Sequence, residues 1–378
     1  MRILMPTADW PPIEGGISTV AYETARELAA MGHEVTVVAP YFPDMRPRDT
    51  AEPVRVLRFH GYGAGWFRVA PMLVKTWPLI KDTDLVLAIN ASHGGLIAWL
   101  ARGFHKKPYV TFAYAYEFMR FRRTPVFREL LRDIYEDSAF VCAISAFTAK
   151  NLEEFGVRPE LIELNRPGAP LAAKVGEEEV TSIRQRLLLG DGPILLSAGR
   201  LVPRKGHVTI VEALPAVLES FPNAVVVMAG RGPAVSDASR RAAELGVRDS
   251  IRMPGYVSDT DLAALYTLCD VFVLPAGADD RGQVEGFGLV FLEANAYGKP
   301  VIGGRSGGTP DAVLDGVTGL LIEPNDPVAL AGAVLRLLNN PAESRRLGER
   351  GRERARTEFT WRRFCESLTT RFKMLPTS

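Results

Sequence analysis

The stretch VEGFGLVFLEANAYGKPVIGG carries two glutamates, Glu285 and Glu293, eight positions apart. We expect Glu285 in a loop and Glu293 one to two turns into the following helix. Gly286 and Gly288 would let backbone N–H groups approach a ligand closely. A carboxylate can accept two hydrogen bonds from a cis-diol, so Glu293 suits a ribose, whereas Glu285 suits sugar hydroxyls or a developing positive charge. The alternative is that Glu293 only pairs on a helix surface, but its apolar neighbours disfavour a solvent-facing position.

A second stretch that could do chemistry is GRLVPRKGH, which begins at Gly199 and follows an expected strand. It presents Arg200 and Lys205, with a further glycine at position 206. Fixed positive charge, free backbone N–H groups and the helix dipole all favour an anion at a helix N-terminus, so this loop suits a diphosphate. Two solvated surface cations are an equal alternative.

Short apolar runs alternate with helical patterns along the whole chain, and these elements must position the two loops. In the first half we expect a helix from about Ile17 to Met31 and strands at Arg2–Pro6, Val35–Ala39, Leu85–Ile89, Tyr109–Phe112 and Phe140–Ile144. In the second half we expect a helix at His207–Ser220 and strands at Pro193–Ala198, Ala224–Ala229, Val271–Leu274, Pro300–Ile302 and Gly319–Ile322. This alternation predicts parallel sheets covered on both faces. The sequence therefore predicts an α/β fold of two Rossmann-like, doubly wound domains facing across a cleft.

The domain boundary is expected between about Pro167 and Gly192, where GAPLAAKVGEEEV carries Gly, Pro and a charge run, as linkers do. The predicted domains are residues 1–170 and 171–358. A long charged helix, Pro341–Glu358, would end the second domain. Residues 359–376 would form a C-terminal helix that packs back on the first domain.

Composition narrows the class of protein. The chain has 378 residues, more than one core usually serves, and its 45 basic and 44 acidic side chains argue against a nucleic-acid partner. Its 3 cysteines form no CxxC pair, which favours a reduced, cytoplasmic compartment. The start, MRILMPTADWPP, reaches proline before an apolar region can form, so we expect no signal peptide. No apolar run approaches the roughly 20 residues of a membrane-spanning helix, although attachment to a membrane surface stays open.

The motifs GRLVPRKG, VEGFGLVFLEA and PVIGGRSGGTPDAVLDGVTGLLIEPND together resemble glycosyltransferase family 4, of the GT-B architecture. The first-half stretch PPIEGGISTVAYETARELAAMGHEVTVV is similar to the N-terminal signature of that family, so the resemblance covers essentially the whole chain. It implies a retaining hexosyltransferase whose first domain binds the acceptor and whose second domain binds a nucleotide-sugar donor. It also implies same-face attack, with the leaving phosphate accepting the proton of the acceptor.

The resemblance implies roles for particular residues. Arg200 and Lys205, with Gly199, would hold the diphosphate, Glu293 the ribose, and Glu285 the sugar. The remaining donor-binding positions would be Gly16, Val257, Phe287, Gly288 and Leu289. Arg200, Lys205 and Glu285 would act catalytically.

The resemblance further implies that neither metal nor cofactor is needed. Two Asp-x-Asp pairs have the spacing of metal-dependent transferases, but both suit structural roles. Asp259-Thr260-Asp261 precedes the apolar-periodic run LAALYTL, which favours helix capping, and Asp82-Thr83-Asp84 leads into a strand as a turn. The glycines of GGRSGG, residues 303–308, are expected to serve packing in a tight turn.

The chain departs from the family in one place. Family members often carry a histidine three residues before an acidic residue, and the matching stretch here is TFAYAYEF. Glu117 is present, but the histidine position is Tyr114, which carries no charge near neutral pH. His93, in NASHGG, is another candidate for an acceptor site, with helix entry as the equal alternative. Whether Tyr114 or His93 takes the role of the missing histidine stays open.

The acceptor is expected to be a lipid, a glycan or a small molecule. Phe118–Arg132, FMRFRRTPVFRELLR, has five arginines against one glutamate, with phenylalanines interleaved. This segment could contact an anionic membrane surface, which would make the protein peripheral on the inner face of the membrane. A solvated surface is the equal alternative.

The motifs favour mannose from GDP-mannose, with glucose or N-acetylglucosamine and a UDP-sugar next. A nucleotide-sugar epimerase of the same architecture is the alternative function. An oxidoreductase is disfavoured, because no GxGxxG follows the first strand. Linkage, acceptor identity and oligomeric state are left open.

Overall fold

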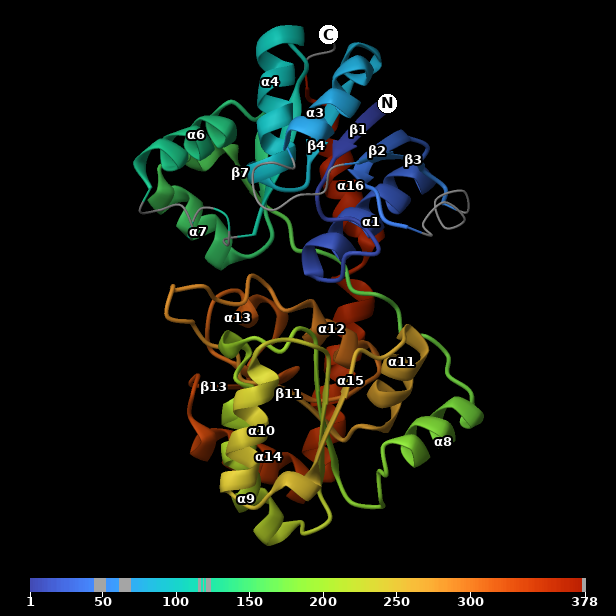
Figure 1. The fold of residues 1–378 in the computed structure, drawn as a ribbon, viewed down its shortest axis with the longest axis vertical. Helices are drawn as coiled ribbons and strands as arrows, with labels where there is room; N and C mark the ends of the chain where they lie inside the picture. Colours follow the sequence, from blue (N-terminus) through green and yellow to red (C-terminus); the bar gives the residue numbers. More distant parts are fainter. Residues whose placement is uncertain (44–51, 61–68, 115–116, 118, 120–123, 376–378) are drawn as a thin grey trace. The chain divides into compact units, whose positions relative to one another are not determined.

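The computed structural model describes residues 1–43, 52–60, 69–114, 117, 119 and 124–375. The chain divides into two compact units (Figure 1). Unit 1 comprises Met1–Gly168 with Trp361–Ser378, and unit 2 comprises Ala169–Thr360. Each unit is a parallel sheet with helices packed on it, so the predicted α/β fold of two Rossmann-like domains is confirmed.

Unit 1 contains a seven-stranded parallel sheet in the order β3-β2-β1-β4-β5-β6-β7. The central strands β4, β5 and β6 are buried at every residue, as expected for strands covered on both faces. The strands are β1 (Arg2–Pro6), β2 (Glu34–Pro40), β3 (Arg55–Phe59), β4 (Leu85–Ala88), β5 (Tyr109–Ala113), β6 (Phe140–Ala143) and β7 (Ile162–Leu164). The order reverses between β1 and β4, which pair at Leu4 and Val86.

The helices of unit 1 follow from their caps and apolar faces. In α7, the Ser145 side chain accepts a hydrogen bond from the Thr148 N–H, and Gly156 ends the helix in the left-handed conformation. The helices are α1 (Gly16–Ala30), α3 (Val69–Thr76), α4 (Leu96–His105), α6 (Pro125–Glu136), α7 (Ala146–Phe155) and α16 (Trp361–Phe372), with the short turns η2 (Trp77–Asp82), η3 (Ala91–Gly95) and η4 (Pro159–Leu161).

The C-terminal helix α16 belongs to unit 1, and in Figure 1 it lies in red beside the blue α1. Its Phe364 ring makes an edge contact with Phe112 of β5 at 5.8 Å between ring centroids. The Asn165 side-chain amide donates to the Phe364 carbonyl at 3.1 Å. Gly168 lies so close to Trp361 that an added Cβ would be 2.5 Å from the Trp361 nitrogen. These contacts attach the last helix to the first sheet.

Unit 2 contains a six-stranded parallel sheet in the order β10-β9-β8-β11-β12-β13, which reverses between β8 and β11. Its strands are β8 (Ile194–Ala198), β9 (Val225–Ala229), β10 (Ile251–Gly255), β11 (Val271–Leu274), β12 (Val301–Gly304) and β13 (Gly319–Ile322). Its helices are α8 (Glu177–Arg186), α9 (His207–Ser220), α10 (Ala234–Glu244), α11 (Asp259–Leu268), α12 (Leu289–Ala296), α13 (Thr309–Ala312), α14 (Pro327–Asn339) and α15 (Pro341–Thr357), with the short turns η5 (Pro203–Lys205) and η6 (Arg248–Ser250).

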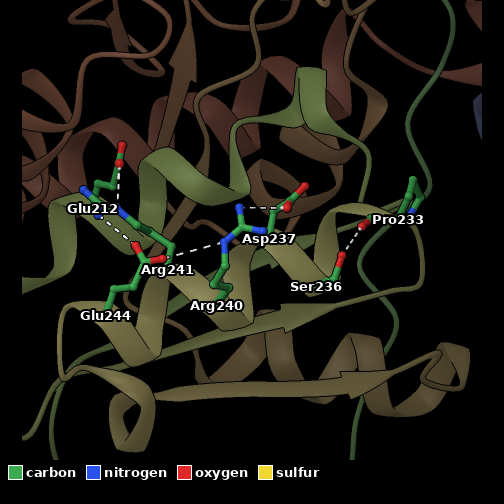
Figure 2. A network of polar contacts seen from close by, with 7 residues as sticks. All are labelled: Glu212, Pro233, Ser236, Asp237, Arg240, Arg241 and Glu244. Atoms are coloured by element: carbon green, nitrogen blue, oxygen red, sulfur yellow. Dashed lines mark hydrogen bonds and ion pairs between the residues drawn. The ribbon is translucent and has the colours of Figure 1, made fainter.

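One ion pair joins helices α9 and α10 at their surface, and further pairs lie within α10 (Figure 2). The Arg241 guanidinium of α10 contacts Glu212 of α9 at 2.9 Å and Glu244 of its own helix at 3.0 Å. Arg240 pairs with Asp237 at 3.0 Å. Because these groups are largely solvated, each pair contributes little to stability, and the network is a helix surface rather than a site.

Two details differ from the predictions. The charge run expected in a linker, Glu177–Glu179, instead begins helix α8, because acidic side chains in a first turn complement the helix dipole. Helix α11 does start at the expected Asp259, but its capping side chain is Ser258, which accepts from the Asp261 N–H at 3.1 Å. The expected turn at Asp82–Asp84 joins η2 to β4.

Candidate active site

Two loops of unit 2 leave the sheet at the point where its strand order reverses. The first follows β8 and carries Arg200 and Lys205, and the second follows β11 and carries Glu285. Ligands of open parallel sheets bind outside the carboxyl ends of the strands at such a reversal. The reversal therefore brings the cationic loop and the first glutamate together although about eighty residues separate them.

The loop after β8 is folded tightly over the sheet. Gly199 has a φ of 122°, and a Cβ there would lie 3.1 Å from Nζ of Lys205. Gly206 has a φ of 72°, and a Cβ there would lie 2.5 Å from the Pro275 carbonyl oxygen. Both positions favour glycine, for conformation and for space. The turn η5 between them places Lys205, which is buried, directly before helix α9.

Glu285 lies between two cations. Its Oε2 atom accepts a hydrogen bond from the Arg204 guanidinium at 3.1 Å and lies 3.5 Å from Nζ of Lys205. Burial raises the pKa of Glu285, but Lys205 and then Arg204 lower it, and the net pKa lies below its ordinary value. Glu285 is therefore a partly buried carboxylate whose ionised form is favoured by the two cations. Arg204 was not predicted from the sequence, although it directly precedes Lys205.

Arg200 is exposed at the carboxyl end of β8, and no ion pair of its side chain is present among the described residues. Arg200 thus lies in the same loop as Lys205 but, unlike Lys205, forms no ion pair with Glu285 among the described residues. The neighbouring His207 is buried, and burial, followed by the charge of Lys205, lowers its pKa to about 4. His207 is therefore neutral at physiological pH.

Glu293 has different surroundings from Glu285. It is the fifth residue of α12, and its Oε2 atom accepts a hydrogen bond from the Tyr266 hydroxyl at 2.8 Å. Burial raises the pKa of Glu293, the Tyr266 hydrogen bond and Lys205 lower it, and the net pKa lies above its ordinary value. Tyr266 was not predicted either, because no motif links it to Glu293.

The residues between the two glutamates form the start of α12. Phe287 is buried, with its ring 5.8 Å from that of Phe359. Gly288 caps the helix with a φ of 94°, and Leu289 is the first helical residue. Behind them, the Gly308 N–H donates to the Glu285 carbonyl at 2.8 Å, so the glycine-rich turn supports Glu285 through its backbone.

Val257 is half-buried in the loop between β10 and α11. Gly16 belongs to unit 1, where it is the exposed first residue of α1. The donor-binding roles of these two residues stay predictions.

Unit 1 gathers polar groups where its own sheet reverses, after β1, β4 and β5. The Asn90 amide donates to Asp9 at 2.9 Å, and Oδ1 of Asn90 accepts from the His93 N–H at 3.0 Å. His93 lies in η3, which leads into α4, and its Nδ1 atom is 3.0 Å from the Ser92 hydroxyl. The Asp9–Asn90 bridge was not predicted from the sequence.

Tyr114 and Glu117 lie next to this cluster. The Tyr114 N–H donates to Oε2 of Glu117 at 3.3 Å, whereas Oε1 of Glu117 is buried and has no hydrogen-bond partner among the described residues. Burial raises the pKa of Glu117 to about 7, although backbone N–H groups, including that of Ala91, lower it. The structure thus brings Glu117 to the turn that carries His93.

Two Rossmann-like units, one with carboxylates and cations gathered at its strand reversal, fit the class of two-domain nucleotide-sugar enzymes, to which glycosyltransferases belong. Comparisons with known proteins agree with this class. Residues 14–172 match the family model described as Glycosyltransferase Family 4, and residues 179–354 match the model described as Glycosyl transferases group 1.

Similar proteins cover the whole chain. The GDP-mannose-dependent alpha-(1-6)-phosphatidylinositol monomannoside mannosyltransferase of Mycolicibacterium smegmatis is 30% identical over 400 residues, covering 98% of each chain. The D-inositol 3-phosphate glycosyltransferase of Corynebacterium glutamicum is 30% identical over 413 residues, covering 98% of this chain and 96% of its own. The crystal structure of Anabaena HepE with UDP and glucose is 19% identical and has a TM-score of 0.84, covering 99% of this chain and 100% of its own.

The chain therefore belongs to the family 4, group 1 glycosyltransferases, and it is a glycosyltransferase. The resemblance inferred from the motifs is confirmed. The epimerase alternative gains no support, because the matched relatives are transferases.

Proposed function

We propose that this glycosyltransferase moves mannose from GDP-mannose to a hydroxyl of an inositol-containing glycolipid, with retention of configuration and without a metal. The donor and acceptor classes are those named for relatives that are 30% identical over nearly the full chain. The observation that carries the donor site is the ionised Glu285 between Arg204 and Lys205, beside the exposed Arg200. Cations held at a strand reversal, before a helix N-terminus, suit a sugar diphosphate.

In this proposal Arg200 and Lys205 bind the diphosphate next to the Gly199 backbone, and Glu293 binds the ribose. Glu285 and the backbone of Phe287, Gly288 and Leu289 hold the mannose. Glu285 would then exchange part of its contact with the cations for contact with the donor. Gly16 and Val257 are proposed to contact the sugar diphosphate and the base.

Same-face attack would use these groups as follows. The bond from the anomeric carbon to the β-phosphate oxygen breaks, and a bond to the acceptor oxygen forms on the same face of the sugar. The acceptor proton goes to the leaving phosphate. Lys205 and Arg200 stabilise the charge that develops on the diphosphate, and Glu285 stabilises positive charge on the sugar.

The acceptor is proposed to bind unit 1, at the cluster of His93, Tyr114 and Glu117. Two relatives support an inositol phosphate portion in the acceptor, since both of their names contain one. A polyol needs donors and acceptors of hydrogen bonds, and these residues carry an imidazole, a phenol and a carboxyl group, of which the Tyr114 hydroxyl and Oε1 of Glu117 are buried. Tyr114 takes the place of the family's histidine as a neutral group.

A thermal-shift panel with GDP, UDP and ADP and their sugars tests the donor assignment. GDP-mannose should raise the melting temperature most, because a ligand that binds only the folded chain stabilises it by mass action. A larger shift with UDP-glucose would replace the proposed donor by the second candidate. Transfer activity that survives EDTA would support metal independence, whereas activity lost in EDTA and restored by Mg²⁺ would contradict it. A product with the α configuration by NMR would support retention.

We also propose a cytoplasmic location, with peripheral contact to the inner face of the membrane through Phe118–Arg132. Phe118 and residues 120–123 lie outside the described residues. In the described part, Val126 is exposed, but Arg128 stacks on Phe155 and Arg132 pairs with Glu129 at 2.6 Å. No helix among the described residues is long and apolar enough to cross a membrane. Pelleting with anionic but not with neutral vesicles is expected, and equal pelleting with both would contradict electrostatic attachment.

A further inference from the structure

Glu293 is held by the protein on one side only. Its Oε2 atom accepts the Tyr266 hydroxyl at 2.8 Å, and its Oε1 atom has no hydrogen-bond donor among the described residues. A carboxylate has about four acceptor positions, so the tyrosine uses one and leaves the others for a ligand. The tyrosine also fixes the rotation of the carboxylate plane.

Tyr266 is itself held rigidly. It is buried near the end of α11, and its ring stacks on Tyr297 with 5.4 Å between centroids and 22° between planes. A second ring, Phe272 of β11, lies 5.9 Å away. Tyr297 is anchored in turn, because its hydroxyl oxygen accepts the Ala173 N–H at 3.0 Å. The position of the Tyr266 hydroxyl is therefore set by packing.

We propose that Tyr266 is a positioning residue for donor binding, whose hydroxyl orients Glu293 toward the ribose of the nucleotide. This inference rests on the proposed function, in which Glu293 binds the ribose. Tyr266 does not need to touch the donor. Its role is to hold an acceptor in place before the ligand arrives, which reduces the ordering that binding requires.

The charges around Glu293 support this role. Burial raises the pKa of the carboxyl group, the Tyr266 hydroxyl and Lys205 lower it, and Asp259 raises it. Burial also raises the pKa of Tyr266 well above its ordinary value, so its hydroxyl remains a donor at any working pH. Removing the hydroxyl would raise the pKa of Glu293 further, so the carboxyl group would become protonated at a higher pH.

The test compares the affinities of GDP and 2′,3′-dideoxy-GDP by calorimetry, for the wild type and for Tyr266→Phe. The two ligands share base and phosphates, so the ratio of their affinities isolates the ribose hydroxyls. The substitution should weaken GDP by up to about tenfold, because the freed Glu293 side chain would have to be ordered when the ribose binds, and leave dideoxy-GDP nearly unchanged. Thr267→Val is the matched control, since it removes the next hydroxyl of α11, which donates to the Ala263 carbonyl at 2.9 Å and makes no hydrogen bond to Glu293.

The pH dependence of the ratio of GDP to dideoxy-GDP affinity distinguishes a loss of Glu293 positioning from a general packing defect around Tyr266. In the wild type the preference for GDP should fall as pH falls and Glu293 takes up a proton. In Tyr266→Phe that fall should occur at higher pH, and in Glu293→Gln the ratio should not change with pH. A general packing defect would lower the affinities for GDP and dideoxy-GDP equally and would leave the pH midpoint of their ratio unchanged.

The outcomes distinguish the inference from the function on which it rests. If Glu293→Gln weakens GDP and dideoxy-GDP equally, the proposed contact between Glu293 and the ribose is wrong. If Glu293→Gln affects GDP alone but Tyr266→Phe matches the wild type in ratio and pH midpoint, only the role of Tyr266 is overturned. A wild type that binds no GDP contradicts the proposed donor.

Discussion

Glu285 and Glu293 lie on the same short segment but have opposite electrostatic surroundings. Lys205 and Arg204 keep the pKa of Glu285 below its ordinary value against the effect of burial. Glu293 is partly buried, with one tyrosine hydrogen bond and a more distant Lys205, and its pKa is raised. The ionised form of Glu285 is thus favoured and suits a developing positive charge, while Glu293 is a hydrogen-bond acceptor for hydroxyls.

At the residue scale, Glu117 makes stability depend on pH. Burial raises its pKa from 4.5 to about 7 in the folded chain. An acid whose folded pKa is raised favours folding below its unfolded pKa, and that contribution is lost as pH rises through the folded pKa. Between about pH 4.5 and pH 7, the wild type should therefore lose up to about 3 kcal/mol of stability through this group.

Glu117→Gln should abolish that loss, because an amide does not ionise. Denaturant unfolding at pH 5 and pH 8 should show the variant gaining stability relative to the wild type as pH rises. If the wild type instead gains stability relative to the variant between pH 5 and pH 8, the Glu117 carboxylate is stabilised by a cation. Its burial would then not be what sets its pKa.

Also at the residue scale, two residues that contact the predicted glutamates were not predicted from the sequence. Glu285, Glu293 and Lys205 were found because they lie in motifs with glycines. Arg204 and Tyr266 were not, although both touch the predicted glutamates. Their contacts depend on the strand reversal and on the packing of α11 against the sheet, and spacing along the chain carries no signal for either.

At the element scale, helix α12 depends on the glycine that precedes it. Gly288 has a φ of 94°, and a Cβ there would lie 2.6 Å from the ring of Phe291, which is fully buried. Gly288→Ala should therefore strain the backbone and displace the start of α12, which carries Glu293. We expect a lower melting temperature and at least tenfold weaker GDP binding, because the helix start holds both glutamates in place.

Gly282→Ala is the matched control. Gly282 lies in the same connection, with a φ of 73°, but a Cβ there would meet nothing within 4 Å. It shares the backbone cost of about 1 kcal/mol without the clash. Equal effects of the two substitutions on GDP affinity would mean that the contact with Phe291 is unimportant.

The bounds of strands and helices with clear apolar runs or helical periodicity were predicted accurately. Strands β1, β11 and β13 and helix α9 have the predicted bounds. Strands β3, β7 and β10 were not predicted, and all three lie at sheet edges. Unlike the fully buried edge strand β13, these three are only partly covered and lack a continuous apolar run; β7 has three residues, and β10 contains Pro254 and an irregular register. The buried centre of each sheet, which positions the site loops, is what apolar runs reveal.

At the scale of the whole molecule, the two sheets share one design. Each reverses its strand order beside its first strand, and each gathers polar side chains there: Arg204, Lys205 and Glu285 in unit 2, and Asp9 and Asn90 in unit 1. The C-terminal helix α16 returns to unit 1, so that unit contains both ends of the chain. One molecule therefore offers two polar reversal sites, which suits a reaction with two substrates.

The most direct test is transfer of labelled mannose from GDP-mannose to a phosphatidylinositol mannoside, by the wild type, Lys205→Ala and the surface control Arg240→Ala. The wild type and the control should transfer mannose equally, since Arg240 is a solvated cation that pairs with Asp237 on α10. Lys205→Ala should lower turnover by about 10²-fold or more, as loss of one charge-stabilising group does. Near-normal transfer by Lys205→Ala would contradict the donor site described above.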